Sequence, residues 1–178
     1  MEFKSTIMDE GAVLRALTRI AHEIVERNDE ANEICIIGIV RRGVALAEVL
    51  SEKLKTLGVG VKTGKLDISL YRDDLSTNQQ DMPTLNKTEI GFDINGVTVV
   101  MVDDVLYTGR TARAAMDALI ELGRPAKIQL AALVDRGHRE LPIRADYVGK
   151  NIPTSKNEVV VVSVPPYDSE TNVKLYNR

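Results

Sequence analysis

The fold is decided by the stretch Val97-Thr98-Val99-Val100-Met101-Val102-Asp103-Asp104-Val105-Leu106-Tyr107-Thr108-Gly109-Arg110-Thr111. It opens with six apolar or β-branched residues, the pattern of a strand that is covered on both faces. After two acids, Gly109 permits a tight turn, and Thr108 and Thr111 bring hydroxyls to the start of a helix. Backbone N–H groups at such a turn, together with the positive end of the helix, form an anion site that suits a phosphate.

The two acids, Asp103 and Asp104, fall where the predicted strand ends. Their carboxylates can accept hydrogen bonds from a sugar diol or help to hold a divalent cation through water. The simpler alternative is a strand-to-helix turn with an Asp cap and no ligand, which would be favoured for a lone Thr-Gly pair. Here the apolar run, the acids and the Thr-Gly-Arg-Thr turn occur in order, so a ligand-binding loop is favoured.

Strand patterns alternate with helix patterns on both sides of this stretch. Helices are predicted over about 9–28, 44–57 and 111–122, the first with Asp9 as its N-cap. Strands are predicted over 34–40, 59–69, 97–102 and 128–134, with shorter candidates at 147–148 and 159–164. This alternation predicts an α/β fold in a single domain, 1–178, with a mostly parallel, doubly wound sheet. Ligands bind such sheets at the carboxyl ends of the strands.

Composition excludes several classes of protein. The formal net charge of −3 gives no global signal for nucleic acid, although a local basic face is compatible with it. The single Cys35 lies in an apolar run, which indicates a core position, excludes an internal disulfide and fits a reducing cytosol. We expect a cytoplasmic protein without a membrane partner, because no apolar run approaches a membrane span and Met1-Glu2-Phe3-Lys4 shows no signal-peptide pattern.

Residues 103–111 resemble the phosphoribosyl pyrophosphate signature of the type I phosphoribosyltransferases. In that family the paired acids hold the ribose hydroxyls and the turn cradles the 5′-phosphate. The resemblance implies Mg²⁺ as a cofactor, bound mainly through the substrate, with Asp103 and Asp104 as the candidate protein contacts. It also implies a small hood near the C-terminal half. The implied substrate- and nucleotide-binding residues are Arg41, Arg42, Asp103, Asp104, Val105, Leu106, Tyr107, Thr108, Gly109, Arg110 and Thr111.

Two further loops match the family. In residues 38–43, glycines flank the pair Arg41-Arg42 at a strand end, which suits either a pyrophosphate or an exposed arginine pair. The family has its pyrophosphate loop here, and the resemblance implies a cis peptide bond before Arg42. The polar stretch 71–95 corresponds to a loop that closes over the substrate, with Arg72 placed to neutralise pyrophosphate. The implied catalytic residues are Arg42, Arg72, Asp103 and Asp104.

Residues 135–155 narrow the resemblance to the bacterial regulators of pyrimidine-operon attenuation that are also uracil phosphoribosyltransferases. The match covers about 8–155. It implies conversion of uracil and phosphoribosyl pyrophosphate to UMP and diphosphate, and binding of operon leader mRNA in response to UMP or UTP. A homo-oligomer is also implied. Tyr107 stands where purine enzymes of the family carry an acid, which favours a pyrimidine base. The expected base-binding residues are Arg136, Val148 and Val160.

Basic residues fall in two groups, one along the first predicted helix and one after the strand at 128–134. On the helix, Arg15, Arg19 and His22 are spaced i, i+4 and i+7, which more commonly marks a solvated face. Two such groups on an acidic protein nevertheless suggest a localised polyanion contact. The predicted RNA-binding residues, all but Arg15 taken from the resemblance, are Arg15, Thr18, Arg19, His22, Arg27, His138, Arg139, Arg144 and Lys150.

Three alternatives accompany this prediction. The chain could be a uracil phosphoribosyltransferase without an RNA-binding role, its basic groups being solvated faces or a subunit interface. It could be a regulator that has lost turnover, against which the intact Asp103-Asp104 pair and the turn at 108–111 weigh. A nicotinamide enzyme is remote, because no glycine fingerprint follows the first buried strand.

Overall fold

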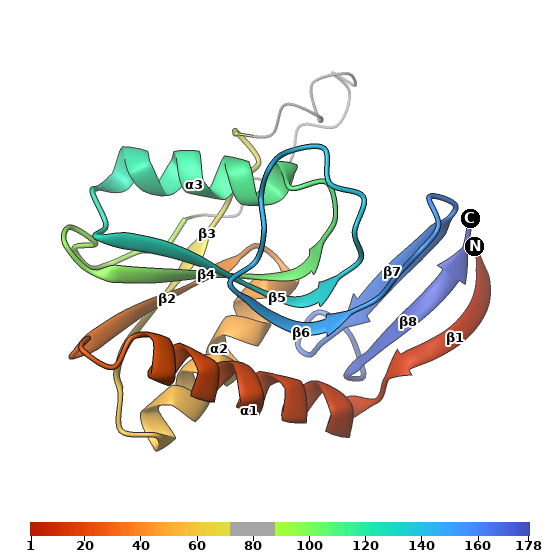
Figure 1. The fold of residues 1–178 in the computed structure, drawn as a ribbon, viewed down its shortest axis with the longest axis horizontal. Helices are drawn as coiled ribbons and strands as arrows, with labels where there is room; N and C mark the ends of the chain where they lie inside the picture. The colour runs from red at the N-terminus through yellow and green to blue at the C-terminus, as the bar shows by residue number, and fades with distance from the viewer. Residues whose placement is uncertain (72–87) are drawn as a thin grey trace.

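The computed structural model describes residues 1–71 and 88–178, shown in Figure 1. Its helices in this part of the chain are α1 (Glu10–Arg27), α2 (Arg42–Thr56) and α3 (Arg110–Leu122). Its strands there are β1 (Glu2–Met8), β2 (Glu33–Ile39), β3 (Gly60–Leu66), β4 (Thr98–Leu106), β5 (Lys127–Asp135), β6 (Tyr147–Asn151), β7 (Glu158–Ser163) and β8 (Asn172–Asn177). These elements confirm the predicted α/β class.

The main sheet is parallel, with the strand order β3-β2-β4-β5-β6. Strand β2 lies in the interior and pairs with β3 on one side and β4 on the other, so that Ile36 is opposite both Thr63 and Val100. The chain therefore reverses direction across the sheet between β2 and β4. Such a switch point opens a crevice at the carboxyl ends of the two strands, and ligands bind there in open α/β sheets.

Both faces of the parallel sheet are covered. Helices α1 and α2 lie on one face and α3 lies on the other, as Figure 1 shows. The side chains of β2 alternate accordingly: Ile34 and Ile36 pack in the cluster with α1 and α2, whereas Cys35, Ile37 and Ile39 pack in the cluster with α3. A strand with two buried faces needs apolar residues at every position, which explains the uninterrupted run that predicted it.

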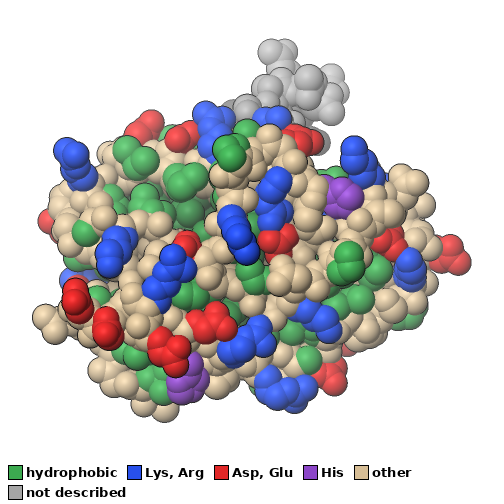
Figure 2. All heavy atoms as spheres, in the orientation of Figure 1, with side chains coloured by type: hydrophobic (Ala, Val, Ile, Leu, Met, Phe, Trp, Pro, Cys, Tyr) green, Lys and Arg blue, Asp and Glu red, His purple; other side chains and the backbone are tan. Residues whose placement is uncertain are grey.

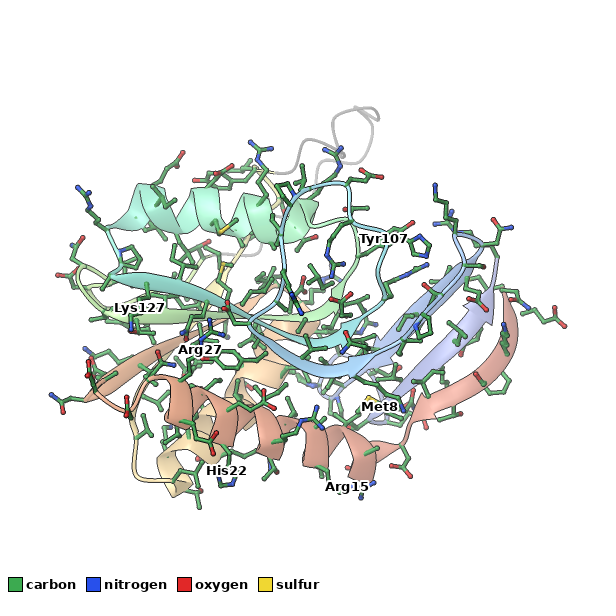
Figure 3. The ribbon with its side chains drawn as sticks, viewed as in Figure 1. Met8, Arg15, His22, Arg27, Tyr107 and Lys127 are labelled. Carbon is green, nitrogen blue, oxygen red and sulfur yellow. The ribbon has the colours of Figure 1, made fainter. Side chains whose placement is uncertain are left out.

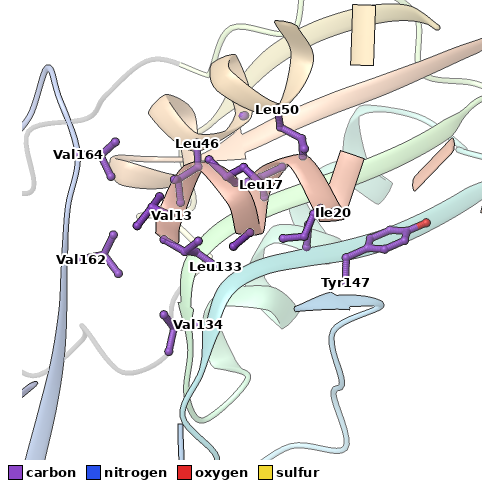
Figure 4. Close-up of a cluster of buried hydrophobic side chains, with 14 of the residues drawn as sticks. Val13, Leu17, Ile20, Leu46, Leu50, Leu133, Val134, Tyr147, Val162 and Val164 are labelled. Carbon is purple, nitrogen blue, oxygen red and sulfur yellow. The ribbon is translucent and has the colours of Figure 1, made fainter. Parts of the chain in front are cut away.

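The cluster beneath α1 and α2 also joins the two sheets. Figure 4 labels part of it: Val13, Leu17, Ile20, Leu46, Leu50, Leu133, Val134, Tyr147, Val162 and Val164. Helix α1 enters this cluster at a fixed point, because the Asp9 carboxylate accepts a hydrogen bond from the Ala12 N–H at 2.7 Å. This N-cap confirms the predicted start of the helix. On the other side of the sheet Cys35 is fully buried, which confirms a core cysteine, and this burial raises the pKa of its thiol to about 11.

A second, antiparallel sheet has the order β1-β8-β7 and forms the hood. The prediction placed the hood near the C-terminal half, but its outer strand comes from the N-terminus, and the two termini lie side by side in Figure 1. Strand β1 was not predicted because most of its residues are exposed and polar, so that it carries no buried run. The hood nonetheless packs against α1, because it contributes Val162, Val164 and Val173 to the same core cluster. Within residues 1–71 and 88–178, no helix is both long and apolar enough to cross a membrane.

Candidate nucleotide site and nucleic-acid interface

The nucleotide loop, residues 103–111, comprises the last four residues of β4, the turn at 107–109 and the start of α3, at the switch point of the sheet. Strand β4 therefore runs four residues beyond its predicted end at 102. Asp103 is buried and Asp104 is half-buried at the end of β4. The Asp103 carboxylate accepts from the Asp104 N–H at 2.9 Å, and the Asp104 carboxylate accepts from the Val105 N–H at 2.9 Å. Each of these bonds fixes the orientation of a carboxylate, so both acids are held rigidly before any ligand binds.

The turn of the loop requires glycine. Gly109 has φ +93° and is the N-cap of α3, and a Cβ there would lie 3.3 Å from the Cβ of Ile143. Backbone N–H groups at the start of α3, including that of Arg110, therefore face the mouth of the loop together with the positive end of the helix dipole. The Thr108 hydroxyl accepts a long hydrogen bond of 3.4 Å from the Arg110 N–H.

A cavity of about 290 Å³ lies in the concave side of this loop. Its lining residues are Asp103, Val105, Leu106, Tyr107, Thr108, Gly109, Arg110, Thr111 and Glu140. All of them except Glu140 were predicted from the sequence, and Asp104 is a predicted loop residue that is absent from the lining. Glu140 is brought in from beyond β5, where it accepts from Arg110 Nε at 2.9 Å. No sequence motif marks it, because its position depends on a contact 30 residues away.

The β2–α2 loop lies against the end of β4 because two glycines permit it. A Cβ on Gly38 would lie 2.4 Å from the Cα of Val44, and a Cβ on Gly43 would lie 2.4 Å from the carbonyl oxygen of Val102. The predicted cis peptide bond was wrong by one residue, since it joins Val40 to Arg41. Helix α2 already begins at Arg42, so the sharp turn between strand and helix falls one residue earlier.

Arg42, at the first turn of α2, forms a two-pronged ion pair with the hood. Its Nε and Nη2 each donate to the Asp168 carboxylate at 2.9 Å. These hydrogen bonds lower the pKa of Asp168 below its ordinary value. The neighbouring Arg41 is exposed, and the predicted Arg72 lies outside the described residues.

Arg136 is buried beside the nucleotide loop. Its guanidinium lies 4.2 Å from the ring centroid of Tyr107 and donates to the carbonyl oxygens of Ser155 at 3.1 Å and Glu158 at 2.8 Å. Burial lowers the pKa of this arginine. Its Nε donates to the Thr154 hydroxyl at 3.2 Å. Residues 154–158 were missed by sequence reasoning, because Thr-Ser-Lys-Asn-Glu is typical of an ordinary polar connection.

The predicted base-binding residues lie on different elements: Arg136 follows β5, Val148 is in β6 and Val160 is in β7. Val148 packs with the α3 cluster, whereas Val160 belongs to the cluster of α1, α2 and the hood. Arg136 contacts the nucleotide loop through the ring of Tyr107. The two valines were suggested for the backbone groups near them, and that part of the set stays a prediction.

The predicted RNA-binding residues of α1 and β6 are grouped under the name basic face: Arg15, Thr18, Arg19, His22, Arg27 and Lys150. Helix α1 runs along β6, and Arg19 Nη2 donates to the carbonyl oxygens of Val148 at 3.0 Å and Gly149 at 2.5 Å. Figure 3 labels Arg15, His22 and Arg27 along α1, and Figure 2 shows the basic side chains mixed with acidic ones on this side of the molecule.

Internal partners hold much of the basic face. Arg27 pairs with Asp146 at 3.0 Å and lies 5.8 Å from the ring centroid of Tyr147. Lys150 Nζ reaches the Ile7 carbonyl oxygen at 3.5 Å. Lys53 of α2, which was not predicted, donates to the Thr18 hydroxyl at 2.8 Å. The side chains of Arg19 and Arg27 are both about half exposed (54%), so they remain accessible to a polyanion while being held in place.

The remaining predicted RNA residues follow β5. Arg139 is engaged inside the molecule: it pairs with Asp135 and donates to the carbonyl oxygens of Tyr107 at 2.6 Å and Ile143 at 2.9 Å. His138, at φ +60°, has its Nε2 2.6 Å from the carbonyl oxygen of Thr154. Arg144 is exposed. Arg139 therefore stabilises the nucleotide loop through its bond to the Tyr107 carbonyl oxygen.

Comparison with known proteins identifies the family to which this chain is similar. The model of the phosphoribosyl transferase domain matches residues 4–169. The "Bifunctional protein PyrR" of Clostridium perfringens is 55% identical over 177 residues and 99% of each chain is covered. That of Deinococcus radiodurans is 58% identical over 175 residues, covering 98% of this chain and 95% of the relative.

Solved structures match the same fold. The hypoxanthine phosphoribosyltransferase of Trypanosoma cruzi superposes with a TM-score of 0.75 at 19% identity, covering 98% of this chain and 97% of that one. The hypoxanthine-guanine phosphoribosyltransferase of Bacillus anthracis gives a TM-score of 0.72 at 21% identity, with 98% of each chain covered. At these identities the structural matches establish the fold alone.

Proposed function

The chain belongs to the phosphoribosyl transferase family and, within it, to the bifunctional PyrR proteins, and on this premise we propose a double function for it. As an enzyme it converts uracil and phosphoribosyl pyrophosphate to UMP and diphosphate. As a regulator it binds the leader mRNA of a pyrimidine operon in response to uridine nucleotide and promotes transcription attenuation. The observation that carries the proposal is the cavity formed by the nucleotide loop at the start of α3.

The loop suits the ribose and the 5′-phosphate of the substrate. The backbone N–H groups of Thr108, Gly109, Arg110 and Thr111 and the positive end of α3 bind the phosphate. The carboxylates at the end of β4 accept from the ribose hydroxyls, and their own backbone bonds keep them in position. Holding the ribose and the phosphate in this way orients the sugar for attack by the base, which lowers the barrier without a covalent intermediate.

The reaction breaks the bond between ribose C1 and the diphosphate oxygen and forms a bond between C1 and N1 of uracil, whose proton is released. Because positive charge develops on the sugar, the protein has to stabilise the departing diphosphate and exclude water. Arg42 is the arginine that we propose for binding the diphosphate. To do so, its guanidinium has to release the Asp168 carboxylate and donate to the ligand instead. We propose the same role for Arg72.

Mg²⁺ fits the residues that are present. Among the described residues, no group of three or more His, Cys, Asp or Glu side chains is placed to hold a metal ion. Magnesium commonly keeps several waters and binds one or two carboxylates together with substrate phosphates, which Asp103 and Asp104 can satisfy. When bound, the ion would neutralise part of the charge of the diphosphate.

The RNA-binding part of the proposal rests on the basic face. Its side chains project from two packed elements, α1 and β6, and a rigid array of cations suits the phosphates of an RNA hairpin. We also propose that the protein acts in the cytoplasm as a homo-oligomer, which would combine the basic faces of several copies.

The enzyme without an RNA-binding role is the second candidate. It is favoured by one observation, the internal partners of Arg19, Arg27 and Arg139. In this alternative the arginines stabilise the fold and their charge is incidental.

Two assays on the same preparation test the proposal. Formation of UMP from uracil and phosphoribosyl pyrophosphate tests the enzyme. Filter retention of a pyrimidine-operon leader hairpin, at one fixed salt concentration with and without UMP, tests the regulator. We expect RNA binding that strengthens with UMP and is lost in Arg19→Gln, with Arg113→Gln on α3 as the matched control. UMP formation with weak, nucleotide-insensitive RNA binding that Arg19→Gln leaves unchanged would support the enzyme alone.

A further inference from the structure

The residues that follow β5 are bonded to the nucleotide loop at consecutive positions. We call residues 136–141 the connecting segment, since it carries the predicted RNA contacts His138 and Arg139. Its bonds to the loop run from Arg136 N to Leu106 O (3.1 Å), from Arg139 Nη1 to Tyr107 O (2.6 Å), and from Glu140 N to Thr108 O (2.9 Å). The loop and the connecting segment therefore form one hydrogen-bonded unit, and neither can shift without straining the other.

One side chain of the loop adds a contact that the backbone bonds do not provide. Tyr107, labelled in Figure 3, is one of the residues that line the nucleotide cavity. The Arg136 guanidinium carbon lies 4.2 Å from its centroid, which is close enough for a cation–π interaction. The His138 ring approaches the same ring edge-on, with centroids 6.0 Å apart and an interplanar angle of 71°. Tyr107 thus lines the cavity, and its ring contacts two side chains of the connecting segment.

The contacted side chains are themselves fixed at a third place. Arg136 Nε donates to the Thr154 hydroxyl, and His138 Nε2 lies 2.6 Å from the Thr154 carbonyl oxygen. His138 adopts φ +60°, a conformation that residues with a side chain seldom adopt, so the surrounding contacts have to hold it. The Tyr107 ring is one of these contacts, and it is the one that a ligand in the cavity meets directly.

We propose that Tyr107 is a positioning residue that transmits occupancy of the nucleotide cavity to the RNA-binding surface through Arg136 and His138. The inference rests on the proposed function, because it assumes a nucleotide site and an RNA site in one chain. A nucleotide packed against the ring holds the connecting segment in place, and RNA then loses less conformational freedom when it binds there. The coupling must be reciprocal, with RNA raising nucleotide affinity by the same factor.

The test compares Tyr107→Leu, which removes the ring, with Tyr107→Phe, which keeps it. For each variant the dissociation constant of the leader hairpin is measured without UMP and with UMP at saturation for that variant. The ratio of the two constants is the coupling factor. We expect Tyr107→Phe to keep the wild-type factor and Tyr107→Leu to lower it by about fivefold or more, toward one. Tyr176→Leu, which removes a ring in the hood, is the matched control and keeps the factor.

The outcomes separate the inference from the function. If Tyr107→Leu weakens RNA binding equally with and without UMP, the ring is merely structural and the inference is overturned. If the wild type itself shows no UMP effect, the proposed regulatory function fails. Thermal melting establishes that each variant is folded. Should Tyr107→Leu not fold, Tyr107→Met, whose flexible unbranched chain adapts to an irregular space without a ring, is put through the same measurement.

Discussion

The nucleotide loop and the basic face offer a ligand different kinds of group. In the loop, these are backbone N–H groups suited to a phosphate and two carboxylates suited to the ribose hydroxyls, all within residues 103–111. On the basic face, they are long cationic side chains from α1 and β6, about half exposed and held by carbonyl oxygens and acids. A site built from the backbone of neighbouring residues can be recognised in a short stretch of sequence. A site built from side chains of distant elements is assembled only when the chain folds.

The largest expected effect removes a charge from the loop and leaves its geometry intact. Asp104→Asn keeps an oxygen that can accept from the Val105 N–H but loses the negative charge beside the ribose. We expect kcat/KM for UMP formation to fall by about 10²-fold or more, with RNA binding in the absence of nucleotide unchanged. Asp117→Asn, on the exposed face of α3, is the control in the same steady-state assay. Parallel losses of activity and of nucleotide-free RNA binding would contradict the separation of the two sites.

Backbone geometry of the loop is tested by Gly109→Ala. A residue with a Cβ at φ +93° costs about 1–2 kcal/mol, and the contact with Ile143 at 3.3 Å adds to this cost. Urea unfolding measures the loss of stability. Gly58→Ala is the matched control, because Gly58 also has a positive φ of +85° but a Cβ there would meet nothing within 4 Å. An equal loss in both variants would show that the loop is not tightly packed against Ile143.

The basic face is tested one charge at a time. Arg15→Gln removes an exposed cation of α1, and we expect leader-RNA affinity at fixed salt to fall by about three- to tenfold. The slope of log affinity against log salt should decrease by about 0.7–1, because one phosphate contact is lost. UMP formation should not change. A wild-type salt slope in the variant would exclude Arg15 from the RNA contact.

The smallest expected effect concerns the tie between the β2–α2 loop and the hood. The guanidinium of Arg42 lowers the pKa of Asp168 in the folded protein below its ordinary value of 3.8. The ion pair therefore stabilises the fold fully above that ordinary value and loses its effect as the pH falls through the lower, folded-state pKa. We expect Asp168→Asn to be less stable than wild type near pH 7 by less than about 1 kcal/mol.

This difference should shrink as the solution is acidified below the ordinary pKa of an aspartate. Urea unfolding of both proteins at a series of pH values measures it, and Asp29→Asn, at an exposed position after α1, is the control. A difference in stability that stays constant with pH would mean that the substitution acts through packing rather than through the charge of Asp168.

The comparison also explains which features the sequence made predictable. The strands of the parallel sheet and the loop at 103–111 were predicted well, because burial on both faces and a turn with a positive φ demand particular residues at successive positions. Strand β1 was missed because it is mostly exposed, and its pairing with β8 joins the two ends of the chain. Glu140, Thr154 and Asp168 were missed for a related reason, since each reaches the site through contacts that no local pattern records.

The cis peptide bond at the β2–α2 junction was placed one residue too late, because its position was taken from the family resemblance, and in this chain α2 already begins at Arg42. The residues of the basic face, apart from Arg15, were predicted by resemblance, but the packing of α1 against β6 was not predicted. It depends on α1 lying along β6, where Arg19 meets two carbonyl oxygens of the strand. The hydrogen bonds of Arg139 inside the molecule could likewise not be predicted. In sequence, a buried arginine near other basic residues looks the same as an exposed one.

The central claim is that one chain holds a nucleotide site and an RNA site that are linked. The most direct measurement titrates UMP calorimetrically into the protein alone and into the protein saturated with the leader hairpin, at one salt concentration. Linkage requires RNA to raise UMP affinity by the factor with which UMP raises RNA affinity. Agreement of the two factors is the predicted result. An affinity for UMP that is the same with and without bound RNA would contradict the account.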